Sequence, residues 1–103
     1  MVTEYVLVGY DRDGDRYDVL ETAADLISIK NKLYSTIITA NKNQTRTYGE
    51  YRAADGSEYD WLEIYAAQEI GQLNKRMCYT KFNYTVGIFE IVWCDTQSFN
   101  IAK

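Results

Sequence analysis

The side chains with the greatest potential for chemistry are carboxylates, which are grouped in two acidic segments. Residues 1–25 hold seven acidic residues and two arginines, and residues 50–69 hold six acidic residues and one arginine. Between them, residues 26–49 hold four basic residues and no acid. Because the acids are grouped, we expect local negative fields that are stronger than the net charge of −4 suggests.

The first acidic segment has aspartates at alternating positions, as calcium loops do. Asp11, Asp13 and Asp15 could offer carboxylate oxygens to a hard cation. The match to a calcium loop fails, because Gly14 is at position four rather than six and Thr22 replaces the glutamate at position twelve. We therefore expect a solvated turn that acts as a contact surface, with no bound metal or other cofactor.

The second acidic segment is interleaved with aromatic residues. Tyrosine and tryptophan are enriched at binding hot spots, and carboxylates select a basic partner. In an alternative interpretation, Tyr59 and Trp61 belong to the core and the neighbouring acids form an ordinary solvated helix face. The predicted partner-binding residues come from both segments: Asp11, Asp13, Asp15, Asp18, Tyr48, Tyr51, Asp55, Glu58, Tyr59, Asp60, Trp61 and Glu63.

Several absences count against an enzyme. The chain has no histidine, which removes the usual general base, metal ligand and partner of a nucleophile. Cys78 and Cys94 are sixteen residues apart and form no C-x-x-C motif, so we expect two reduced thiols rather than a disulfide or a zinc site. No export signal or membrane span is evident, which favours the cytoplasm.

The apolar periodicity predicts one α+β domain over residues 1–103, with a mainly antiparallel sheet and two helices on one face in the order ββαβαββ. A hairpin should comprise strands 3–10 and 17–20, with the first strand in the sheet interior. Thr22 and Asp25 form a start signal for a helix over about 23–40.

The second half should contain a short exposed strand, a helix and two strands. Alternation predicts the short strand over 46–54, and Ser57 with Asp60 resembles a helix cap. A helix near 58–76 and strands over 79–85 and 86–95 should follow, the last in a central position, with an edge strand or tail at 99–101. The helix is predicted from an apolar stripe that comprises Leu62, Ala66, Ile70, Leu73 and Met77.

For function, these features favour a small acidic protein-binding module that is not an enzyme. In size and surface chemistry the chain resembles small acidic phage proteins that inhibit CRISPR nucleases or restriction enzymes. This resemblance implies a nucleic-acid mimic that occupies the basic nucleic-acid-binding groove of a target protein such as a nuclease. A pI near 4.7 argues against direct nucleic-acid binding, although Arg46 and Arg52 beside Tyr48 and Tyr51 leave a small RNA-binding alternative open.

Two further classes of function stay open. One is a small-ligand or metal-binding domain, and the less favoured one is an enzyme that uses carboxylate, tyrosine or cysteine chemistry. Salt-sensitive association with a basic protein would favour the binding module. Calcium-dependent stabilisation would favour a metal-binding domain. Catalytic turnover that is lost when one carboxylate residue is replaced would favour an enzyme.

Overall fold

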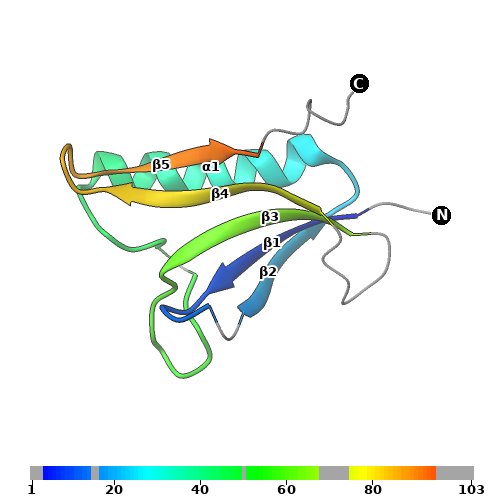
Figure 1. Ribbon diagram of the computed structural model, residues 1–103, viewed down its shortest axis with the longest axis horizontal. Coiled ribbons are helices and arrows are strands. Elements are labelled where there is room, and N and C mark those ends of the chain that lie inside the picture. Colours follow the sequence, from blue (N-terminus) through cyan, green and yellow to red (C-terminus); the bar gives the residue numbers. More distant parts are fainter. Residues whose placement is uncertain (1–3, 15–16, 50, 68–74, 95–103) are drawn as a thin grey trace.

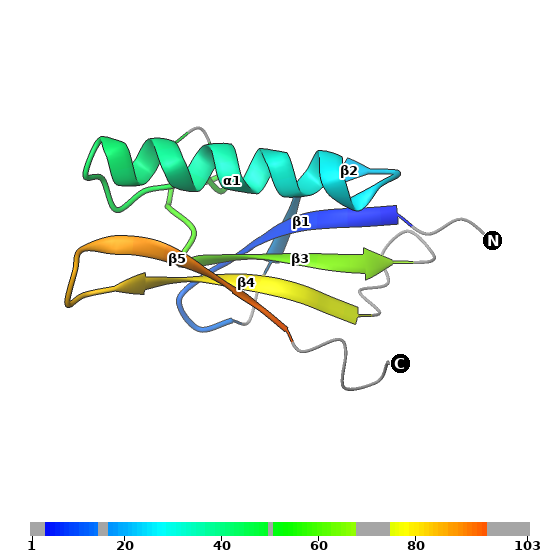
Figure 2. The same cartoon turned by 90° about the horizontal axis from the view of Figure 1, so that it is seen from above.

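The strands form a five-stranded antiparallel sheet with the order β2-β1-β3-β4-β5, and one helix covers one face of it (Figures 1 and 2). The computed structural model describes residues 4–14, 17–49, 51–67 and 75–94. Its elements are β1 (Glu4–Tyr10), β2 (Tyr17–Ala23), α1 (Leu26–Lys42), β3 (Trp61–Ala67), β4 (Lys75–Asn83) and β5 (Ile88–Trp93). The described part of the chain is therefore a single compact α+β domain with one helix, where two were predicted.

The predicted hairpin is confirmed, and β1 lies in the sheet interior between β2 and β3. Its residues alternate between the two faces: Leu7 joins the core beneath α1, whereas Val6 and Val8 form a smaller cluster on the opposite face, called here the open face. At the hairpin turn, Gly14 has a φ of 73°, and its N–H donates to the carbonyl of Asp11 at 3.1 Å. A positive φ explains the glycine at this position.

The first predicted helix is also confirmed, with its start shifted to Leu26. Thr22 pairs with Val6 in the sheet, so it cannot cap the helix. Asp25 is the N-cap instead, and its carboxylate accepts a 2.8 Å hydrogen bond from the N–H of Ser28. The buried stripe that packs on the sheet comprises Ile29, Leu33, Ile37 and Ala40.

The predicted second helix is wrong, because β3 and β4 occupy the described parts of that region. Leu62 and Ala66 lie four residues apart, and a spacing of four puts two side chains on one face in a strand as well as in a helix. Ile64, between them, is fully buried and joins the same core cluster as Leu62. The residues of β3 that join this cluster therefore lie two positions apart, as in a strand. Ile70 and Leu73 lie outside the described residues.

Two predicted strands also differ from the structure. Where a short strand was expected over 46–54, the described residues form an irregular segment with one isolated bridge, between Arg52 and Glu58. β5 was expected to be central, but in the described part of the chain it pairs with β4 alone and is an edge strand. Its apolar residues on both faces were the source of this error. The predicted element at 99–101 lies outside the described residues.

The helix content of the described ranges bears on a membrane span. Within them, α1 is the only helix, and no helix is both long enough and apolar enough to cross a bilayer.

Candidate functional site

The two acidic segments meet at one end of the sheet. The N–H of Asp60, just before β3, donates to the carbonyl of Tyr10 at 2.7 Å, where β1 enters the hairpin turn. A Cβ atom on Gly14 would lie 3.2 Å from the Trp61 ring. In Figure 1 the β1–β2 turn and the green loop before β3 lie at the same end of the molecule. We call this region the acidic end, and its carboxylates are Asp11, Asp13, Asp18, Asp55, Glu58 and Asp60.

The carboxylates of the acidic end differ in their surroundings. Asp13 and Asp60 are exposed, and neither side chain has a hydrogen-bond or ion-pair partner among the described residues. Glu58 is ion-paired with Arg52 at 3.1 Å. Asp55 is exposed and accepts hydrogen bonds from the N–H and the hydroxyl of Ser57, at 2.9 and 2.6 Å.

Asp11 and Asp18 are half-buried. Asp15, which was predicted to belong to this surface, lies outside the described residues. Across the described part of the chain, no three His, Cys, Asp or Glu side chains are grouped closely enough to hold a metal ion.

Three tyrosines of the predicted site are buried in the core. The Tyr48 and Thr80 hydroxyls are 2.8 Å apart, and the Tyr51 hydroxyl donates to Glu21 at 3.2 Å. The Tyr59 hydroxyl donates to Asp18 at 2.7 Å. These tyrosines hold the segment before β3 against the sheet and so stabilise the acidic end. Because they are buried, they are not exposed anchors for a partner.

Trp61 and Glu63 lie on the open face of β3, beyond the acidic end. Glu63 is only 4% exposed, and its Oε2 accepts from Trp61 Nε1 at 2.9 Å and from Arg76 at 3.3 Å. Its Oε1 is buried and has no hydrogen-bond partner of ordinary geometry. Glu63 is therefore part of an internal polar network, and Trp61 is half-buried.

Aromatic rings surround this network on the open face. Tyr10 stacks on Trp61, with ring centroids 5.0 Å apart and planes 7° apart, and it also contacts Tyr17. The hydroxyls of Tyr10 and Tyr65 are 3.2 Å apart. Burial, followed by hydrogen bonding to Glu63, raises the pKa of Tyr65 far above its ordinary value. Tyr65 therefore stays protonated and serves as a hydrogen-bonding group rather than a base.

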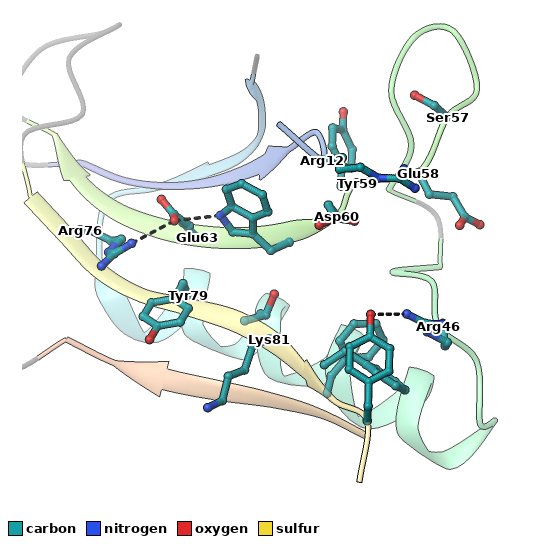
Figure 3. A pocket seen from close by; sticks show the side chains of 15 residues that line it. Arg12, Arg46, Ser57, Glu58, Tyr59, Asp60, Glu63, Arg76, Tyr79 and Lys81 are labelled. Carbon is teal, nitrogen blue, oxygen red and sulfur yellow. Dashed lines mark hydrogen bonds and ion pairs between the residues drawn. The ribbon is translucent and has the colours of Figure 1, made fainter. Parts of the chain in front are cut away.

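A cleft of about 830 Å³ opens between β3 and β4 beside the acidic end. Figure 3 shows the two strands diverging toward this end, with Asp60 on the β3 side and Lys81 on the β4 side. Arg46, from the segment after α1, lies at the far side of the opening (Figure 3). The cleft is lined by Arg12, Arg46, Ser57, Glu58, Tyr59, Asp60, Trp61, Glu63, Arg76, Tyr79, Thr80, Lys81, Phe82, Tyr84 and Phe89.

This cleft could not be predicted from the sequence. Its lining comes from the β1–β2 turn, the segments before and within β3, β4, the turn after β4 and the start of β5. Among the lining residues outside the predicted site, Arg46 is the one for which the sequence predicted a binding role, in the RNA-binding alternative. The basic residues Arg12, Arg76 and Lys81 are scattered along the chain, so no local pattern marks them.

Comparisons with known proteins identify no relative. The chain matches no protein-family model, and no curated protein or solved structure shows significant similarity to it. The acidic end and the cleft are therefore the features from which a function can be inferred.

Proposed function

We propose that this chain is a small protein-binding module whose acidic end binds a basic surface of another protein. The supporting observation is the contact between Asp60 and Tyr10, which puts two acidic segments on one end of the sheet. This end carries six described carboxylates and only two described arginines, Arg12 and Arg52. The negative fields of the six carboxylates add, and the combined field steers a basic partner and speeds its association.

Short-range affinity at this end comes from a different aromatic residue than the sequence suggested. Tyr17 is 40% exposed, follows the hairpin turn and contacts Tyr10. Large, rigid aromatic side chains beside a charged rim are typical of binding hot spots. We therefore assign the steering role to Asp13 and Asp60 and the anchoring role to Tyr17.

The partner class that best fits this surface is a protein with a basic nucleic-acid-binding groove. Such a groove is built to surround phosphates, and a compact group of carboxylates presents a similar arrangement of negative charge. An inhibitor of this kind blocks the groove without touching nucleic acid. A nuclease or another nucleic-acid-binding enzyme is the partner that this proposal predicts.

The test compares three baits in pull-downs from the native host, followed by mass spectrometry. The baits are wild type, the acidic-end variant Asp13→Asn/Asp60→Asn, and the control variant Asn31→Lys/Ser35→Lys on the exposed side of α1. Both variants raise the net charge equally. A basic nucleic-acid-binding protein retained by wild type and by the α1 control, but lost from the acidic-end variant, would support the proposal.

The captured protein is then purified and its binding kinetics are measured. We expect Asp13→Asn/Asp60→Asn to slow association about tenfold at low salt, and Tyr17→Ala mainly to speed dissociation. Duplex DNA should compete with the chain for the partner. Equal association rates for the two charge variants would refute steering by the acidic end, and binding that DNA leaves unchanged would refute groove occupancy.

A further inference from the structure

The cleft between β3 and β4 is held open by buried hydrogen bonds. The paired register of the two strands ends at Glu63 and Tyr79. One position further, the N–H of Leu62 donates to the Thr80 hydroxyl at 3.0 Å, and this hydroxyl also contacts the Tyr48 hydroxyl. Because side-chain hydroxyls replace the backbone ladder at this point, the strands diverge without leaving the Leu62 N–H unsatisfied.

The charges in the cleft are opposite in sign to the net charge of the chain. The described lining has four cationic and three carboxylate side chains. Glu58 and Glu63 are each ion-paired with an arginine, and the partner of Glu58, Arg52, lies outside the lining. This leaves Asp60 as the unpaired lining carboxylate. Three cationic residues have no ion pair in the described part of the chain: Arg12, Arg46 and Lys81.

Arg46 is positioned to bind an anion. Its guanidinium lies 4.6 Å from the Phe82 ring centroid and 4.7 Å from that of Tyr84. One nitrogen donates to the Tyr84 hydroxyl at 2.7 Å. Two aromatic rings and one hydrogen bond thus orient the planar group, and its remaining N–H donors are available for the paired oxygens of a phosphate.

Trp61 offers a flat surface on the other side of the cleft. Tyr10, from β1, stacks on one face of its ring. Trp61 also lines the cleft, and β4 lies on the opposite side of β3 from β1, so we infer that the ring face not covered by Tyr10 is turned toward the cleft. A planar ring stacked on this face would continue the aromatic stack. Stacking on an aromatic side chain is the usual way in which proteins hold an unpaired base.

We propose that this cleft binds a nucleoside phosphate, with the base stacked on Trp61 and the phosphate held by Arg46 and the neighbouring cations. A volume of about 830 Å³ is in the range of small-molecule and cofactor sites. The site is distinct from the acidic end in its key residues, because neither Arg46 nor Trp61 has a role in steering the partner protein. The nucleotide is either free or part of a single strand, and the experiment separates these sources.

The fluorescence of Trp61 reports ligand binding in the test. The chain has two tryptophans, so Trp93→Phe leaves Trp61 as the single one. This variant is titrated with the four nucleoside 5′-monophosphates, with inorganic phosphate and with a single-stranded tetranucleotide. We expect saturable quenching of Trp61 fluorescence by nucleotides, far weaker binding of inorganic phosphate, and agreement with calorimetry on the wild-type chain.

Two variants with the same change in charge test the role of Arg46. Arg46→Gln should weaken nucleotide binding about tenfold or more, whereas Lys32→Gln, on the exposed side of α1, should leave it unchanged. Thermal unfolding confirms that both variants are folded. Tighter binding of the tetranucleotide assigns the ligand to single strands, and tighter binding of a monophosphate assigns it to free nucleotides.

Three results would overturn the proposal. They are the absence of saturable quenching at millimolar nucleotide, equal affinity for inorganic phosphate and nucleotides, and equal affinities of the Arg46 and Lys32 variants. None of these results would affect the proposed function, since protein binding at the acidic end is measured with Asp13, Asp60 and Tyr17.

Discussion

The hydroxyl of Tyr59 donates a 2.7 Å hydrogen bond to the carboxylate of Asp18, which is 41 residues earlier in the chain. This contact links the segment before β3 to β2, and therefore links the two acidic segments. Tyr59 is buried, and its ring packs against Gly9 in the strand between them. The shape of the acidic end thus depends on a tyrosine that is itself hidden from any partner.

Replacing Tyr59 with phenylalanine tests this link. The variant keeps the ring but removes the donor to Asp18, and we expect the free energy of unfolding to fall by about 1–2 kcal/mol. Urea denaturation measures the change. Tyr79→Phe is the matched control, because the Tyr79 hydroxyl has no hydrogen-bond partner in the described part of the chain, and its stability should be unchanged. Equal stabilities of the two variants would show that the bond to Asp18 contributes nothing.

Gly9→Ala tests the close approach of the Tyr59 ring to β1. A Cβ atom on Gly9 would lie 2.6 Å from Tyr59 Cγ, at the inner end of the ring rather than at a flexible tip. We expect a loss of about 1–3 kcal/mol of stability, measured by urea denaturation. In a Tyr59→Ala background the same substitution should cost much less, since the clash is gone. An equal cost in both backgrounds would place the strain elsewhere.

The hairpin and α1 could be predicted because their signals are local. A period-two pattern with an Asp-Gly turn specifies the hairpin, and Asp25 with the Leu33 and Ile37 stripe specifies the helix. β3 could not be predicted in this way. Leu62 and Ala66 fit both a helix and a strand, and pairing with β1 on one side and β4 on the other decides between them.

The candidate sites show the same limit. The acidic segments are visible in the sequence, but their meeting depends on the pairing of β1 with β3. The burial of Tyr48 and Tyr59 depends on how the loop folds back on the sheet, which no local pattern reports. The cleft depends on the replacement of a ladder bond by the Thr80 hydroxyl. Such sites arise from tertiary contacts alone.

The two cysteines should differ in reactivity. Both are free thiols, as predicted, with Cys78 buried and Cys94 partly exposed. Burial raises the pKa of Cys78 to about 12, so almost no thiolate forms at ordinary pH. Iodoacetamide followed by mass spectrometry should therefore label Cys94 and spare Cys78 until urea unfolds the chain. Rapid labelling of Cys78 in the folded protein would contradict its burial.

A reductant should leave the midpoint of thermal unfolding unchanged, because there is no bridge to break. A large drop in the midpoint, with a two-proton gain in intact mass, would instead reveal a disulfide in the protein as isolated.

Stability should fall in alkaline solution because buried acids keep their protons in the folded state. Burial raises the pKa of Cys78 to about 12. Burial also raises the pKa of Tyr48 well above the ordinary tyrosine value. Once the pH exceeds the unfolded pKa values, about 8.5 for cysteine and about 10 for tyrosine, the unfolded chain releases protons that the folded chain retains. The unfolded state then binds fewer protons, so the free energy of unfolding decreases with pH.

The stabilising contribution of both groups is therefore complete below about pH 8 and is lost progressively as the pH rises toward the folded pKa values. Each group contributes a slope of up to about 1.4 kcal/mol per pH unit. Urea denaturation at intervals between about pH 8 and pH 11 measures it. Cys78→Ala is expected to lower stability at every pH but to flatten the first part of the decline, which separates thiol ionisation from general charge repulsion. A curve for Cys78→Ala that runs parallel to wild type would show that Cys78 ionises as readily in the folded protein as in the unfolded chain.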